Sequence, residues 1–114
     1  MDVASLPDES AITAITLAEL AAGPLATQDE QERARRQDRL QFAAATWDAL
    51  PFDAESARAY ARVFAAARAA GRTHRSRLAD LLIASTAASN GLALHTSNPA
   101  DFKGLKAIVR VIAV

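Results

Sequence analysis

The pattern of hydrophobic and polar positions changes sharply between residues 75 and 105. A basic start leads into an almost wholly apolar run, in which Asp80 stands among leucine, isoleucine and alanine, and no charged residue follows until Asp101. A helix that is apolar on all sides is expected to be buried, and a carboxylate there is costly unless another group pairs with it. Gly91 is predicted to end this helix, and residues 92–96 are predicted to form a short strand before a polar loop.

The rest of the chain alternates between short β-branched runs and stretches with helical periodicity. Asp53 and Ser76 are predicted helix caps, and Thr16 is a predicted cap with Glu19 at capping-box spacing. The further strands are predicted at 11–15, 48–52 and 108–114, and the further helices at 17–22, 28–47 and 54–70. Strands that alternate with helices indicate an α/β fold around a mainly parallel sheet.

Residues 28–39 are the most charged part of the chain, and two interpretations of them are open. The favoured one is a solvated helix face on which acids and bases form i,i+4 pairs. The other is a surface that contacts RNA, although the interleaved acidic residues weaken the attraction that such a surface would have for phosphate.

Composition narrows the class of protein. The 114 residues suit a single domain spanning 1–114, and 51% hydrophobic with 23% charged residues is typical of a globular chain. The formal net charge is zero, so no global field draws the protein to nucleic acid or to a membrane. The chain has no cysteine and its first residues do not form a signal peptide, which favours a cytoplasmic protein.

Three acidic residues are the candidates for chemistry. Glu19 follows the first predicted strand by one helical turn, Asp101 follows the strand 92–96, and Asp80 opens the apolar helix. Ligands of parallel sheets bind beyond the carboxyl ends of the strands, so these side chains could meet at one edge. Carboxylates with Asn and Thr oxygens favour Mg²⁺ or Mn²⁺ over zinc. Such an ion can activate water and stabilise a phosphodiester under attack.

Each acid also has a purely structural explanation. Glu19 could complete a capping box, Asp80 could pair with Arg77, and Asp101 could cap a turn after Pro99. The chemical interpretation therefore depends on the three acids occurring together.

These segments resemble a known family. The segments are ITLAEL with Glu19, ADLLIASTAASNGLAL with Asp80, and HTSNPADF with Asp101. In this order they resemble the PIN-domain toxins of the VapC type, and the most specific piece comprises Thr96, Asn98, Asp101 and Phe102.

The resemblance implies a PIN-like α/β/α sandwich and a Mg²⁺- or Mn²⁺-dependent endoribonuclease toxin that cleaves structured RNA such as tRNA or rRNA. It implies a VapB-type antitoxin as partner, a homodimer and no membrane. By the same resemblance, Glu19, Asp80 and Asp101 hold the metal and Thr96 and Asn98 support them. Candidates for phosphate contact are Arg72, Arg75, Arg77 and Lys103.

The chain departs from the family at its start. PIN domains begin with a central strand that ends in an aspartate, and the segment before Ala11 has no such strand, so we expect an N-terminally short domain whose first, central strand is missing. A mis-assigned or shortened start is the favoured explanation. The alternative function is therefore a catalytically incomplete module that binds an antitoxin or dimerises without cleaving RNA.

Overall fold

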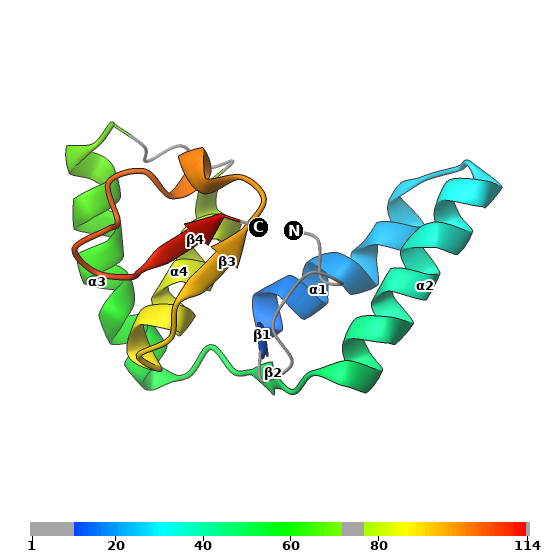
Figure 1. Ribbon diagram of the computed structural model, residues 1–114, viewed down its shortest axis with the longest axis horizontal. Coiled ribbons are helices and arrows are strands. Elements are labelled where there is room, and N and C mark those ends of the chain that lie inside the picture. Colours follow the sequence, from blue (N-terminus) through cyan, green and yellow to red (C-terminus); the bar gives the residue numbers. More distant parts are fainter. Residues whose placement is uncertain (1–10, 72–76, 114) are drawn as a thin grey trace. The chain divides into compact units, whose positions relative to one another are not determined.

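The chain folds into helices and short parallel strands. The computed structural model describes residues 11–71 and 77–113, and these divide into two compact units, one within Pro7–Pro51 and one within Phe52–Val114. Each unit contains one pair of parallel strands (Figure 1). The predicted α/β class and parallel pairing are confirmed, while the described strands are shorter than predicted and form two two-stranded sheets.

The unit within Pro7–Pro51 passes directly from a strand into a helix. Thr13 is the N-cap, because its Oγ1 accepts a hydrogen bond of 3.0 Å from the backbone N–H of Thr16. The prediction that Thr16 caps this helix is wrong, and Glu19 lies in the middle of the helix rather than in a capping box. In chain order the elements are β1 (Ile12–Thr13), α1 (Ala14–Ala22), the 3-10 helix η2 (Gly23–Ala26), α2 (Glu30–Thr46) and β2 (Ala49–Leu50).

The charged face of α2 consists of ion pairs along the helix. Glu32 accepts hydrogen bonds from Arg35 and Arg36, at 2.6 Å from Nη2 of Arg35 and 3.1 Å from Nε of Arg36. These pairs lower the pKa of Glu32. The favoured interpretation of this segment, a solvated face with mixed pairs, is confirmed for these residues.

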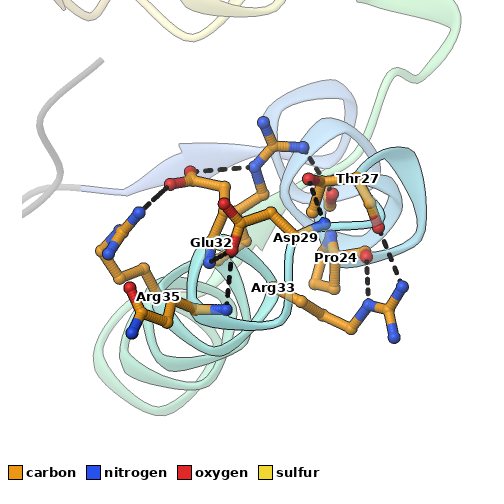
Figure 2. A network of polar contacts seen from close by, with 9 residues as sticks. Pro24, Thr27, Asp29, Glu32, Arg33 and Arg35 are labelled. Atoms are coloured by element: carbon orange, nitrogen blue, oxygen red, sulfur yellow. Dashed lines mark hydrogen bonds and ion pairs between the residues drawn. The ribbon is translucent and has the colours of Figure 1, made fainter.

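Arginines of α2 also bind the turn that joins α1 to α2. Arg33 donates through Nε to the carbonyl of Pro24 at 3.2 Å and through Nη2 to that of Thr27 at 2.9 Å (Figure 2). Arg36 donates to the carbonyl of Gly23 at 2.8 Å. Carbonyls at a helix end have no partner within the helix, so these guanidinium groups supply donors that hold the turn against α2.

The unit within Phe52–Val114 is built on two packed helices. Asp53 caps α3, as predicted, by accepting from the N–H of Ser56 at 2.9 Å. The next helix is buried through its middle turns, as its apolar sequence predicts, while Leu78 at its start is exposed. Ser56 and Ser89 share a hydrogen bond of 2.9 Å between the two helices. The elements are α3 (Ala54–Ala69), α4 (Leu78–Ser89), β3 (Leu94–Thr96), the 3-10 helix η4 (Pro99–Phe102) and β4 (Val111–Ala113).

Within the described ranges, no helix combines the length and the apolar character that crossing a membrane requires.

Gly104 lets the segment after η4 approach the end of α3. Its φ is +93°, and a Cβ at this position would lie 2.6 Å from the Cβ of Ala70. We expect Gly104→Ala to lower the free energy of unfolding by about 2–5 kcal/mol, because the left-handed backbone costs about 1–2 kcal/mol and overpacking about 1–3 kcal/mol more. Urea unfolding followed by circular dichroism measures this loss.

Gly91 provides the matched control. Its φ is +66°, and nothing lies within 4 Å of a Cβ built there. Gly91→Ala therefore bears the backbone term alone, about 1–2 kcal/mol. Equal losses in the two variants would show that the contact with Ala70 has no energetic weight.

Candidate active site

The first turn of α4 carries the acid that the sequence singled out. Asp80 is the third residue of α4 and follows the N-cap position, which Arg77 occupies without a side-chain capping bond. A negative charge in the first turn interacts favourably with the helix dipole. The middle turns of α4 are mostly buried and carry no charged residue, so the charge of this helix is confined to its start.

The segment Thr96–Phe102 forms a turn that presents Asp101. The buried hydroxyl of Thr96 accepts the N–H of Asn98 at 3.0 Å, and the carbonyl of Asn98 accepts the N–H of Asp101 at 3.0 Å. Phe102 is buried and anchors η4 in the core. Thr96 and Asn98 therefore act here through the turn, since their hydrogen bonds determine where the Asp101 carboxylate lies.

Arg77 joins the two acids. Its Nη1 forms an ion pair and hydrogen bond with Oδ1 of Asp101 and lies 3.7 Å from Oδ2 of Asp80. The three side chains are 30%, 32% and 27% exposed respectively, so all are half-buried. Asp80 and Asp101, which are far apart in the chain, thus face one guanidinium group. The predicted pairing of Asp80 with Arg77 is confirmed, and Asp101 pairs with the same residue.

The environment disfavours a charge on Asp80. Burial raises the pKa of Asp80 above its ordinary value of 3.8, the negative charge of Asp101 raises it further, and Arg77 opposes both effects. The pKa of Arg77 is raised, chiefly by its hydrogen bond to Asp101. A carboxyl group whose pKa is shifted by burial and by neighbouring charges is typical of a functional site.

This raised pKa predicts that Asp80 destabilises the fold near neutral pH. Between pH 3.8 and the raised pKa the folded state binds more protons than the unfolded state, so stability falls as the pH rises through that window. We expect Asp80→Asn, which does not titrate, to unfold at higher urea concentration than the parent protein at pH 7. Urea titrations followed by circular dichroism at pH 3 and pH 7 test this.

The pH dependence separates this effect from a general gain in packing. Below pH 3.8 the parent Asp80 is protonated in both states, so the advantage of Asp80→Asn should disappear. An advantage of equal size at both pH values would contradict the assignment to the charge of Asp80.

The donor chemistry of the acid pair suits a hard divalent cation. Mg²⁺ is often held by one or two carboxylates together with water and substrate phosphates, and Asp80 and Asp101 offer two carboxylates that already face a cationic group. Over residues 11–71 and 77–113, no three His, Cys, Asp or Glu side chains come together as a possible metal site. Glu19 is exposed on α1 in the other unit, so the grouping of all three acids stays a prediction.

The basic residues predicted for phosphate contact have different outcomes. Arg77 is committed to the acid pair, and Lys103 is exposed directly after η4. Arg72 and Arg75 lie outside the described residues, as does the predicted cap Ser76. The contact between Arg77 and Asp101 does not follow from sequence spacing, and the available signal was the arginine three positions before Asp80.

Comparison with known sequences gives one consistent result. The PIN domain family matches residues 3–107. The chain is 40% identical to Ribonuclease VapC5 of Mycobacterium tuberculosis in an alignment of 116 residues. The alignment covers 100% of this chain and 83% of that protein. It is 39% identical to Ribonuclease VapC8 of the same organism over 85 residues, or 75% of each protein.

Solved structures agree with the sequence comparison. A crystal structure of VapBC-5 from Mycobacterium tuberculosis, a member of the VapBC family of toxin–antitoxin systems, matches with a TM-score of 0.84 at 38% identity. The match covers 100% of this chain and 89% of that one. The crystal structure of FitAcB from Neisseria gonorrhoeae matches with a TM-score of 0.70 at 28% identity, over 96% of this chain and 79% of that one.

Proposed function

Because the chain belongs to the PIN domain family, we propose that it is the ribonuclease toxin of a VapBC-type toxin–antitoxin pair and requires Mg²⁺ or Mn²⁺. The observation that carries the proposal is the pairing of Asp80 and Asp101 around one guanidinium group. That arrangement occurs in a chain 40% identical to a protein named as a ribonuclease. Two converging carboxylates can hold a divalent cation together with water and the phosphate of the substrate.

Each residue has a defined task in this proposal. Asp80, Asp101 and Glu19 hold the cation, which when bound lowers the pKa of a water molecule and stabilises the charge that develops on phosphate. Thr96 and Asn98 keep η4 in the conformation that presents Asp101.

Basic side chains bind the RNA backbone in the same proposal. Lys103 is exposed beside Asp101 and can contact phosphate, as can Arg77 once its guanidinium leaves the acids. Arg72 and Arg75 complete the basic set from outside the described residues. These contacts make RNA binding weaker at high salt, because each neutralised phosphate releases counterions.

The proposal includes partners and a location. The similarity to the VapBC-5 structure supports a VapB-type antitoxin as partner. Structured RNA such as tRNA or rRNA is the proposed substrate, a homodimer is the proposed assembly, and the bacterial cytoplasm is the proposed location. A single PIN-like domain spanning 1–114 belongs to the same proposal.

Cleavage of a bulk tRNA pool and of rRNA by the purified chain tests the activity. We expect fragments with Mn²⁺ or Mg²⁺ and intact RNA with EDTA, because the proposed site activates water only through its cation. A gel of end-labelled RNA resolves the products. Cleavage that continues undiminished in EDTA would contradict a metal-dependent mechanism.

A second candidate function is a catalytically incomplete module that binds an antitoxin without cleaving RNA. The observation that favours it is that Arg77 already pairs with both Asp80 and Asp101. Calorimetric titrations with Mn²⁺ and with a VapB-type antitoxin separate the two functions. Antitoxin binding without any Mn²⁺ binding would favour the incomplete module.

A further inference from the structure

Arg77 differs from three other paired arginines in its partners. Arg35, Arg36 and Arg58 each pair with a single glutamate three or four residues away on the same helix, and their side chains are 63%, 32% and 67% exposed. Arg77 is 30% exposed and faces two acids, one at the start of α4 and one 24 residues away on η4. Water and salt screen half-buried charges less than exposed ones, so the contacts of Arg77 carry more electrostatic weight than those of Arg35 and Arg58.

One nitrogen of Arg77 faces both of the aspartates in the candidate site. Its Nη1 faces Oδ1 of Asp101 and Oδ2 of Asp80 together, which are the two carboxylates proposed to hold the cation. An oxygen that accepts a hydrogen bond from a guanidinium group cannot use the same lone pair to coordinate a metal. A divalent ion and a guanidinium at the same acids also repel each other strongly. The guanidinium stays protonated at any physiological pH, so it can leave only by moving its side chain.

We propose that Arg77 is a built-in counter-ion that competes with the divalent cation for Asp80 and Asp101. This rests on the proposed function of the same site. Without metal, Arg77 offsets one of the two negative charges of Asp80 and Asp101 and holds η4 against the start of α4. When metal binds, the guanidinium gives up Asp101 and becomes available to an RNA phosphate. Arg77 thereby sets how much free metal is needed to load the site.

Metal affinity in a charge-removing variant tests the competition. We expect Arg77→Gln to bind Mn²⁺ about tenfold more tightly than the parent chain, because a repelling positive charge is removed and the acids lose their internal partner. Arg77→Lys keeps the charge and should stay within about twofold of the parent chain. Arg58→Gln, which removes an exposed pair in the same unit, should leave the affinity unchanged. Isothermal titration calorimetry gives all four dissociation constants.

A measurement on the parent chain covers the case in which Arg77→Gln does not fold. Diamagnetic Mg²⁺ is added to ¹⁵N-labelled protein while the side-chain Nε–Hε signals of arginine are followed by NMR. We expect the Arg77 signal to shift and its exchange with water to accelerate as the contact with Asp101 breaks, while the Arg58 signal stays in place.

The outcomes separate this inference from the proposed function. Mn²⁺ binding to Arg77→Gln that is equal to or weaker than binding to the parent chain overturns the competition and leaves the metal site standing. The same holds for an Arg77 signal that does not respond to saturating Mg²⁺. Failure of both chains to bind Mn²⁺ overturns the inference together with the proposed metal site.

Discussion

Replacing Asp101 by Asn is expected to lower the rate of metal-dependent RNA cleavage by about a hundredfold or more. The substitution keeps the size of the side chain but removes the negative charge that faces Arg77 and the proposed cation. The hydrogen bonds of Thr96 and Asn98 that form the turn use the hydroxyl and the backbone, so the turn should remain. Initial rates of tRNA cleavage at saturating Mn²⁺, with circular dichroism to verify folding, measure the effect.

Asp53→Asn is the matched control for this loss. Asp53 lies in the same unit and caps α3 through its side-chain oxygen, a role that Asn fulfils about equally well. We expect cleavage by this variant to match that of the parent chain. An Asp101→Asn variant that retains half or more of the parent rate would remove Asp101 from the site.

The same assay tests whether Glu19 belongs with the two aspartates. Glu19→Gln should reduce cleavage to a similar extent as Asp101→Asn if the residue holds the cation. A variant with full activity would limit the site to the acids of the unit within Phe52–Val114.

Leu105→Ala is expected to lower the free energy of unfolding by about 2–5 kcal/mol. Leu105 is 1% exposed and is the largest fully buried side chain among the described residues. Its removal leaves a cavity beside the segment that follows η4, and the lost contacts are a large share of the roughly 5–15 kcal/mol that stabilises a domain. Urea unfolding followed by circular dichroism measures the change.

Leu92→Ala is the matched control, because Leu92 lies in the same unit and is 46% exposed. Truncating an exposed leucine removes little buried surface, so the loss should stay below about 1 kcal/mol. Similar losses in the two variants would mean that the segment around Leu105 is not part of the cooperative core.

Local chemistry explains what could be predicted from the sequence. The cap at Asp53, the helix that Gly91 ends and the turn from Thr96 to Phe102 depend on residues a few positions apart. Capping, left-handed glycine and side-chain hydrogen bonds to the backbone act over that range, so their signals are written in the local sequence. The family resemblance rests partly on two of these segments, the helix that Gly91 ends and the turn from Thr96 to Phe102.

The first helix begins earlier than its β-branched residues predict. Residues 11–15 are predicted to be a strand, yet the helix begins at Ala14 with Thr13 as its cap. Propensity over five residues is a weak preference, and here the hydrogen bond from the N–H of Thr16 to Thr13 accompanies the helix start. The role of Gly104, by contrast, depends on packing, since the side chain that a Cβ would meet belongs to Ala70.

By itself the sequence determined the fold class, because hydrophobic periodicity specifies helices and strands directly. The family and the candidate acids came from the resemblance of three of its segments to a known family. Only the tertiary structure decided that Asp80 and Asp101 face a single guanidinium of Arg77. The partner of a charge 24 residues away depends on how α4 and η4 pack, and no spacing rule describes that distance. The electrostatic balance at the site, and with it the proposed competition between Arg77 and metal, therefore follows from the fold.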